Sequence, residues 1–122
     1  MIRDILLVGA GSCLGGILRY LVSLLVHSAK GGFPWSTFLV NIIGCLIIGL
    51  LWGLTNRQTN ASSLLNLFLM VGFCGGFTTF STFSKENLVL LQSGNYFVFA
   101  LYSLGSISIG LAAVALGYAM SK

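Results

Sequence analysis

The sequence contains very little charge, and acidic residues are the scarcest. Only 7% of its 122 residues are charged, with two acids against six lysines and arginines, whereas 57% are hydrophobic. A water-soluble domain usually carries about 25% charged residues, so eight charged side chains cannot cover a soluble globule of this size. The net charge of +4 is nowhere dense enough to form a patch that binds nucleic acid. The composition therefore excludes a soluble enzyme, a disordered tail and a nucleic-acid-binding protein.

Residues that build catalytic and metal centres are also scarce. The chain has one histidine, His27, and three cysteines, Cys13, Cys45 and Cys74, each within an apolar run. An odd number of cysteines without paired spacing does not indicate a disulfide framework, and such residues usually act as small buried side chains. The sequence offers no Ser–His–Asp set and no phosphate-binding loop. We therefore expect no enzymatic activity.

Long hydrophobic stretches are what the chain has instead. Three of them carry no charge at all: Gly31–Asn56, Gln58–Ser84 and Asn87–Ser121. Each exceeds the ~20 apolar residues that a transmembrane helix needs. Together with the apolar N-terminal segment they predict one transmembrane domain over residues 1–122, with spans at about 5–26, 35–55, 63–91 and 96–120. The runs are continuous rather than alternating, so we expect an all-α integral membrane protein in a lipid bilayer and no β-barrel.

The charges around these spans are distributed almost evenly. Four spans place both termini on one side, together with Arg3, Arg57 and Lys122, while Lys30 and Lys85 lie near the other side. Positively charged loops normally set the orientation of a membrane protein, and this bias is weak. A weak bias permits insertion in both orientations, which gives the hypothesis of dual topology.

Glycine is abundant, and several glycines are spaced for close helix packing. The chain has 16 glycines, which include the GxxxG pairs Gly11–Gly15, Gly49–Gly53 and Gly72–Gly76. Such pairs let helix backbones approach closely in lipid. They fit tight packing within one four-helix bundle, and they also fit a dimer interface. A transport function favours the dimer, because four short helices leave little room among themselves for a polar conduit.

The third span contains a sequence that is unsuited to a continuous helix. Gly75 and Gly76 are followed by Thr78 and Thr79 in the middle of the span, and all four have low helix propensity. Backbone that leaves the helix at membrane depth must be buried in protein or line a cavity, and its freed carbonyls can bind a cation. The third helix is therefore predicted to be broken mid-membrane, unless the glycines form only a packing notch.

Aromatic and hydroxyl side chains follow this predicted break. Phe80 and Phe83 are three residues apart and share one helix face, with Ser81 and Thr82 beside them. Hydroxyls donate hydrogen bonds and the edges of aromatic rings are electropositive, so this combination can solvate a small anion. Two aromatic residues on one face also occur in an ordinary hydrophobic core.

Other polar side chains lie within the remaining spans. Asn41 shares a face with Thr37 in the second span, Arg19 lies in the last third of the first, and Tyr102 and Ser106 are four residues apart in the fourth. Polar groups at membrane depth are costly unless they are paired, which makes them candidates for function. Single interhelical hydrogen bonds, snorkelling of the arginine and ordinary packing are the structural alternatives.

Three segments together resemble one family. Gly15–Tyr20, Thr37–Gly44 and above all Gly72–Glu86 (GFCGGFTTFSTFSKE) are similar to the motifs of the Fluc (CrcB-like) fluoride channels. The resemblance covers all four spans in order, and the fourth is the least well matched. It implies a passive fluoride-selective channel in the bacterial inner (plasma) membrane that exports fluoride. It also implies a dual-topology antiparallel homodimer with two pores.

The resemblance also implies a role for particular residues. Pore-lining positions match Asn41, Phe80, Ser81, Thr82, Phe83, Tyr102 and Ser106. Backbone carbonyls that match Gly75 and Thr78 would hold a structural Na⁺ at the dimer axis, and Arg19 and Glu86 would belong to the aqueous vestibules. Lys85 matches no motif position that we can place.

Two other classes of small membrane protein remain as alternatives. A small dual-topology multidrug transporter would need an embedded carboxylate in its first span, and Ile5–Val26 contains no acid. A structural membrane subunit would explain the GxxxG pairs but not the pattern of hydroxyls and phenylalanines. Asp4 and Glu86 both lie near span ends, so no proton carrier is expected mid-membrane, which favours a passive channel.

Overall fold

The described part of the chain forms four long apolar spans, all of them helical. The computed structural model describes residues 1–26, 32–57 and 63–122. The helices are α1 (Ile2–Leu25), α2 (Trp35–Arg57), the third span in several pieces, and α6 (Tyr96–Ser121). Segments long and apolar enough to cross a membrane are Ile2–Leu25, Trp35–Thr55, Leu64–Gln92 and Tyr96–Ser121. The prediction of four apolar helical spans, each long enough to cross a membrane, is confirmed.

The third span is broken, as predicted, but the glycine pair is not the point of the break. It consists of α3 (Ser63–Asn66), the π-helical η1 (Leu67–Cys74), α4 (Gly75–Phe77) and α5 (Ser81–Gln92). Gly75 is helical, with φ −62° and ψ −38°. The backbone becomes extended at Thr78, where ψ is 157°. Gly76 is needed inside the helix for packing, since a Cβ there would lie 2.5 Å from the backbone oxygen of Ser12.

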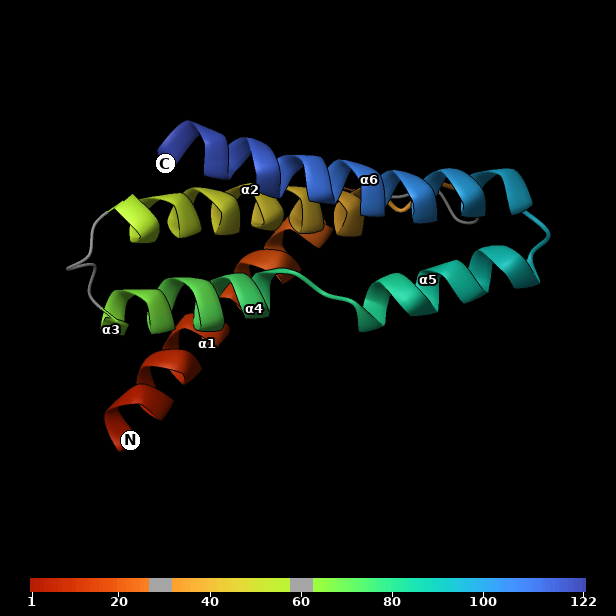
Figure 1. Cartoon of the computed structure of the whole chain (residues 1–122). Coiled ribbons are helices and arrows are strands. Elements are labelled where there is room, and N and C mark those ends of the chain that lie inside the picture. Colours follow the sequence, from red (N-terminus) through yellow and green to blue (C-terminus); the bar gives the residue numbers. More distant parts are fainter. Residues whose placement is uncertain (27–31, 58–62) are drawn as a thin grey trace.

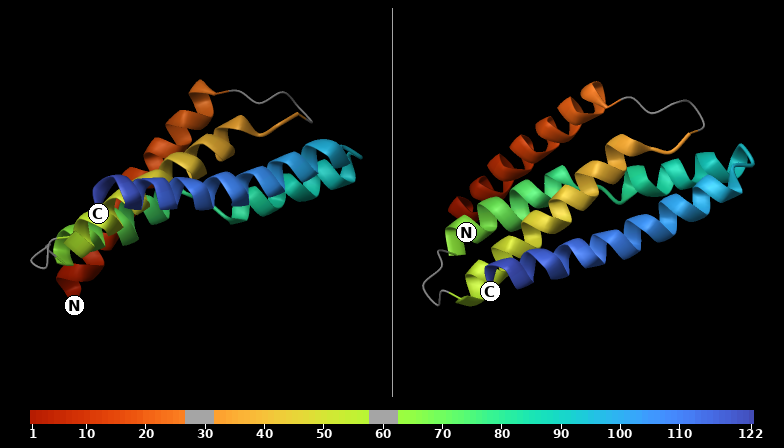
Figure 2. Two further views of the ribbon diagram at one scale, coloured as in Figure 1. Left: turned by 45° about the horizontal axis from the view of Figure 1, so that its top comes forward. Right: turned by 90° about the horizontal axis from the view of Figure 1, so that it is seen from above.

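The break lets the third span change its neighbour halfway along (Figure 1). The first half, η1 and α4, packs against α1, whereas α5 packs against α6. α2 and α6 lie side by side and run in the same direction (Figure 2). Both chain termini lie at the same end of the molecule (Figures 1 and 2), as expected for an even number of spans.

The GxxxG pairs serve packing within the chain. A Cβ added at Gly15 would clash with the carbonyl of Phe73, and one at Gly49 would clash with the carbonyl of Val114. A Cβ added at Gly72 would lie 2.8 Å from the backbone oxygen of Val8. Close backbone approach of this kind requires glycine. The structure therefore bears out packing inside one four-helix unit, and a role of these pairs in a dimer interface stays a prediction.

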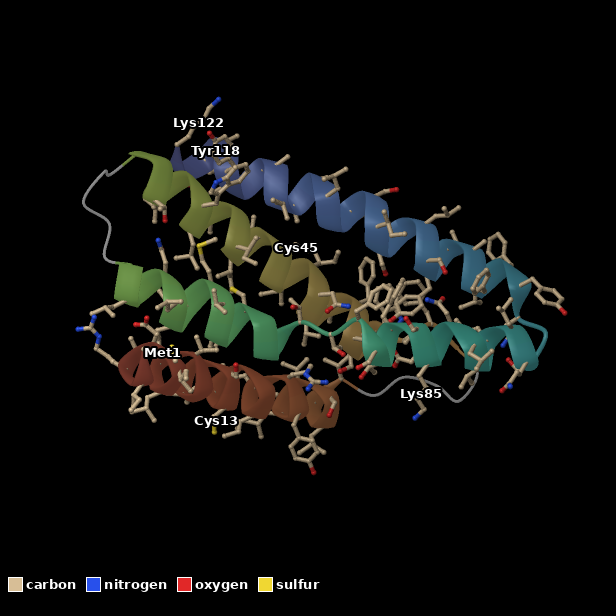
Figure 3. All side chains as sticks on the ribbon, turned by 60° about the horizontal axis from the view of Figure 1, so that its bottom comes forward. Met1, Cys13, Cys45, Lys85, Tyr118 and Lys122 are labelled. Atoms are coloured by element: carbon tan, nitrogen blue, oxygen red, sulfur yellow. The ribbon has the colours of Figure 1, made fainter. Side chains whose placement is uncertain are left out.

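Little of the apolar surface is covered by the chain itself. In the most apolar 18-residue stretch of α1, and likewise in that of α6, only 11% of the residues are buried by the rest of the chain. Large side chains such as Phe97 and Leu111 are exposed by 76% and 71%. A surface this apolar must be covered by lipid or by another protein surface. Lys85 projects outward from α5, away from α6 (Figure 3).

Candidate functional site

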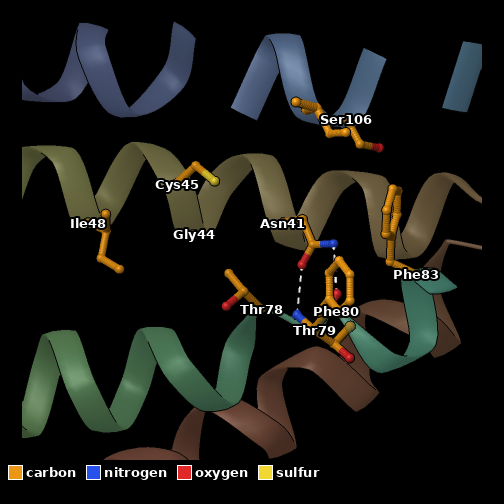
Figure 4. Close-up of a pocket in the computed structure, with 10 residues that line it drawn as sticks. Asn41, Gly44, Cys45, Ile48, Thr78, Thr79, Phe80, Phe83 and Ser106 are labelled. Carbon is orange, nitrogen blue, oxygen red and sulfur yellow. Dashed lines mark hydrogen bonds between the residues drawn. The ribbon is translucent and has the colours of Figure 1, made fainter. Parts of the chain in front are cut away.

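The break in the third span is held by one side chain of α2. The Asn41 Nδ2 atom donates to the carbonyl of Thr79 over 3.1 Å, and the Thr79 N–H donates to Asn41 Oδ1 over 2.8 Å (Figure 4). Backbone groups that leave a helix inside a membrane must find partners within the protein. Asn41 supplies both partners at once, so it makes two interhelical hydrogen bonds instead of one.

Threonine hydroxyls make hydrogen bonds on both sides of the break. The Thr78 hydroxyl donates to the carbonyl of Cys74 over 2.8 Å, and the Thr78 N–H donates to the same carbonyl over 2.9 Å. The Thr79 hydroxyl accepts from the Thr82 N–H over 3.3 Å, at the start of α5. Free N–H groups in the first turn of a helix need such partners. Thr79 therefore supplies a partner for the first turn of α5, whereas Thr78 adds a second hydrogen bond to a carbonyl that is already paired.

An open groove lies between α2, the break and α6. Its volume is about 310 Å³, and it is lined by Asn41, Gly44, Cys45, Ile48, Thr78, Thr79, Phe80, Phe83, Ser106 and Ile107 (Figure 4). Four of the predicted pore residues thus meet in one place: Asn41, Phe80, Phe83 and Ser106. None of these lining residues is charged; most of the lining is apolar, and its polar side chains are hydroxyls and one amide.

Ser106 contributes a polar atom that no protein group satisfies. Its Oγ is buried and has no hydrogen-bond partner among the described residues. Buried hydroxyls nearly always have a partner, so an orphan one needs an explanation. Ser106 also lines the groove, so its unpaired hydroxyl is a candidate donor to a ligand there.

Aromatic rings continue from the groove toward α6. The rings of Phe80 and Phe83 have centroids 6.0 Å apart, and those of Phe83 and Tyr102 are 4.9 Å apart. Phe80 is 79% exposed on the open side of the chain, whereas Tyr102 is fully buried. The two phenylalanines therefore line the groove, and Tyr102 lies behind Phe83.

Glu86 lies outside the groove, and two hydroxyls hold its carboxylate. The Tyr102 hydroxyl donates to Oε1 over 2.8 Å, and the Thr37 hydroxyl donates to Oε2 over 3.1 Å. Neither Glu86 nor Tyr102 is part of the groove lining. This arrangement joins α5 to both α2 and α6 through one carboxylate.

A second, more polar basin adjoins the groove. Its volume is about 300 Å³, and it is lined by Gly16, Arg19, Tyr20, Ser23, Ser36, Thr37, Val40, Thr79 and Thr82. The Arg19 Nε atom donates to the carbonyl of Gly76 over 3.2 Å. Thr79 lines both spaces. The structure thus places the predicted vestibule arginine and the predicted pore residue Thr82 together, while Ser81 is exposed beside them.

Gly75 and Thr78, whose carbonyls are predicted to bind a cation, differ in exposure: Gly75 is exposed and Thr78 is half-buried. Gly75 is exposed, and a Cβ added there would have nothing within 4 Å. Thr78 is the residue at which α4 ends. Among the described residues no group of three His, Cys, Asp or Glu side chains is placed to hold a metal ion. Any cation here would have to be bound by backbone oxygens.

Sequence reasoning missed a polar pair beside the predicted residues. The Ser103 hydroxyl donates to Asn87 Oδ1 over 2.8 Å, and Asn87 Nδ2 donates to the carbonyl of Phe83 over 3.1 Å. Their positions directly after Glu86 and Tyr102 are the only hint in the sequence. Periodicity within a helix cannot say which residues of two helices face each other.

Comparison with known proteins gives one consistent family. The family model described as "CrcB-like protein, Camphor Resistance (CrcB)" matches residues 6–118. A protein of Azobacteroides pseudotrichonymphae genomovar. CFP2 is 46% identical over 123 residues, which covers 100% of this chain and 98% of the relative. One of Phocaeicola vulgatus is 45% identical, with 98% and 99% covered, and one of Chlorobium luteolum is 48% identical, with 98% and 92% covered. All three relatives are named "Fluoride-specific ion channel FluC".

Proposed function

The chain belongs to the CrcB-like family, and on this premise we propose that it is a fluoride-specific channel of a bacterial membrane. The observation that carries the proposal is the groove in which Asn41, Phe80, Phe83 and Ser106 meet. It contains hydrogen-bond donors and ring edges and no charged side chain. Such a surface can replace the water around a small anion without trapping it.

Fluoride would be held by donors that the protein leaves unused. One N–H of the Asn41 amide is committed to Thr79, and the other is available to an anion. The Ser106 hydroxyl has no acceptor in the described chain. Ring edges of Phe80 and Phe83 add a weak positive potential. Several weak sites in sequence let an ion enter and leave again, which conduction requires.

The polar basin would serve as the vestibule of this pathway. The guanidinium of Arg19 raises the local concentration of anions, and the Thr82 hydroxyl lies in the same basin. Thr79 lines both the basin and the groove, so an anion would pass this one residue to move between them. Ser81 is exposed and directly precedes Thr82 in the chain, so its hydroxyl would add a further polar group to the pathway. Glu86 and Tyr102 would not bind the anion directly, because their side chains are already hydrogen-bonded to each other.

We propose that the functional unit is an antiparallel homodimer with one pore along each groove. The groove is open on one side and Phe80 is 79% exposed there, so a single chain does not enclose a conduit. A second copy would close it. The weak charge bias of the loops is compatible with insertion of the two copies in opposite orientations.

We further propose that Na⁺ binds between the two copies at the carbonyls of Gly75 and Thr78. Backbone oxygens suit a small hard cation, and the surroundings of Gly75 are open. Two backbone oxygens are too few to bind such an ion, so a matching pair from the second copy would complete the site. Bound there, the ion would supply fixed positive charge next to the anion pathway.

Fluoride efflux from liposomes tests the proposed function. Purified protein is reconstituted into liposomes loaded with potassium fluoride, and release is followed with a fluoride electrode after the membrane potential is clamped. Liposomes loaded with chloride are the control. Rapid fluoride release without chloride release is expected. A folded protein that releases neither ion would instead favour the structural membrane subunit, and release that depends on a proton gradient would favour a transporter.

A further inference from the structure

The position of α5 depends on a few side-chain contacts. α5 begins after the break, so no continuous helix connects it rigidly to α4. α5 packs mainly against α6, and Glu86 also accepts from Thr37 of α2. Two adjacent residues of each helix form polar links between α5 and α6. The first link is Glu86 to Tyr102, and the second is Asn87 to Ser103, each with a length of 2.8 Å. We call the second link the Asn87–Ser103 pair.

The Asn87–Ser103 pair leads directly to a groove residue. Asn87 uses both ends of its amide: Oδ1 accepts from the Ser103 hydroxyl, and Nδ2 donates to the carbonyl of Phe83. The Phe83 ring lies against Tyr102, the residue before Ser103. The pair thus fixes the turn of α5 that carries Phe83, although neither Asn87 nor Ser103 lines the groove.

Rotation of α5 is the motion that these contacts prevent. One residue of an α-helix corresponds to a rotation of about 100°, so even a fraction of that would swing the Phe83 ring out of the groove. In a membrane, apolar contacts between helices do not select one rotation strongly, because lipid tails are equally apolar. Directional hydrogen bonds do select one, since they fail when donor and acceptor turn apart.

We propose that Asn87 and Ser103 are positioning residues that set the rotation of α5 and thereby the orientation of the Phe83 ring in the groove. The part of this inference that concerns ion flux rests on the proposed channel function. The part that concerns the ring does not, because the orientation of Phe83 can be measured without any ion.

The first test is fluoride efflux from liposomes with the single variants Ser103→Ala and Asn87→Ala and with the double variant. Flux should fall about 3- to 10-fold in each, the range that one interhelical hydrogen bond in a membrane allows. The double variant should be no worse than the more impaired single one, because both break the same link. Ser103→Thr keeps the hydroxyl and should restore flux. Chloride release should rise in the impaired variants, which a mere loss of folded protein would not cause.

Ser93→Ala is the matched control. The Ser93 hydroxyl also donates one hydrogen bond, to the carbonyl of Leu90 over 3.1 Å, but it is exposed at the far end of α5. Flux should remain at the level of the unmodified protein. If Ser103→Ala and Asn87→Ala behave like Ser93→Ala, the positioning role is refuted.

The second test is ¹⁹F NMR of the protein with 4-fluorophenylalanine at position 83. The resonance should move or broaden in Ser103→Ala and Asn87→Ala and stay unchanged in Ser93→Ala. An unchanged resonance in all three variants would overturn the inference. If the unmodified protein conducts no fluoride, the proposed function fails, and this spectrum alone still decides whether the pair positions the ring.

Discussion

The double hydrogen bond between Asn41 and Thr79 makes a strong prediction for the variant Asn41→Asp. The substitution keeps the shape of the side chain and its Oδ1 acceptor for the Thr79 N–H. It replaces the Nδ2 donor by a second oxygen, which then faces the Thr79 carbonyl at about the present 3.1 Å. The carbonyl loses its partner, which costs about 1–3 kcal/mol for a buried group. We therefore expect a folded but destabilised protein.

The effect on fluoride transport should exceed the effect on stability. Two like charges 4 Å apart repel by about 4 kcal/mol at an effective dielectric constant of 20, which corresponds to roughly a thousandfold slower passage. Relaxation and water would reduce this, so we expect flux to fall at least about 100-fold. Lowering the pH should restore part of the flux, because a protonated carboxyl is neutral and can donate to the Thr79 carbonyl again.

The assay is fluoride efflux from liposomes, with gel filtration and circular dichroism to verify that the variant is folded. Asn66→Asp is the matched control. Asn66 lies in α3, outside the groove, where its Oδ1 accepts from the Thr55 hydroxyl over 3.1 Å, and an aspartate retains that acceptor. Normal conduction is expected for this control. Normal conduction by folded Asn41→Asp protein would refute the placement of Asn41 in the anion path.

Four further predictions follow from the packing, the groove and the proposed assembly. Phe83→Ile should reduce fluoride flux at least about tenfold, since it removes the ring edge while roughly keeping the volume; unchanged flux would remove ring edges from the mechanism. Gly15→Ala should lower stability by about 1–3 kcal/mol in thermal unfolding because its Cβ meets the Phe73 carbonyl, whereas Gly16→Ala should not, having nothing within 4 Å; equal effects would contradict the packing. Replacing Na⁺ by a bulky organic cation should weaken dimerisation or flux, and indifference to the swap would count against the carbonyl site. A reporter fused after Lys122 should be found on both sides of the membrane; a single orientation would exclude the antiparallel assembly.

Hydrophobic length was sufficient to predict the four helices from the sequence. In a bilayer, an uncharged stretch such as Asn87–Ser121 pairs its own backbone N–H and C=O groups by forming a helix. The broken third helix was also predictable, because Gly75, Gly76 and the tandem threonines all disfavour a helix. The exact residue within Gly75–Thr79 was not predictable: both glycines are helical, and Gly76 serves the close approach of Ser12. The extended turn therefore occurs at Thr78, where Asn41 can pair with the next residue.

The sequence did not allow us to predict which side chains of different helices contact each other. Periodicity placed Asn41 on a polar face but did not reveal Thr79 as its partner. The family resemblance predicts a pore hydroxyl at Tyr102, and in the structure that hydroxyl donates to Glu86. Asn87 and Ser103 were overlooked altogether. Such pairs depend on which two helices are neighbours and on their relative rotation, and neither is encoded in the spacing within one helix.

Arg19 illustrates how a costly residue can serve structure and function at once. A single arginine at the centre of a transmembrane helix costs on the order of 3 kcal/mol on insertion scales. Its Nε atom donates to the Gly76 carbonyl at the C-terminal end of α4, where the helix dipole is negative and carbonyls lack partners. The break that creates the groove also creates this acceptor. The same arginine lines the polar basin. A continuous third helix would thus remove both the groove and the reason why an arginine is tolerated beside it.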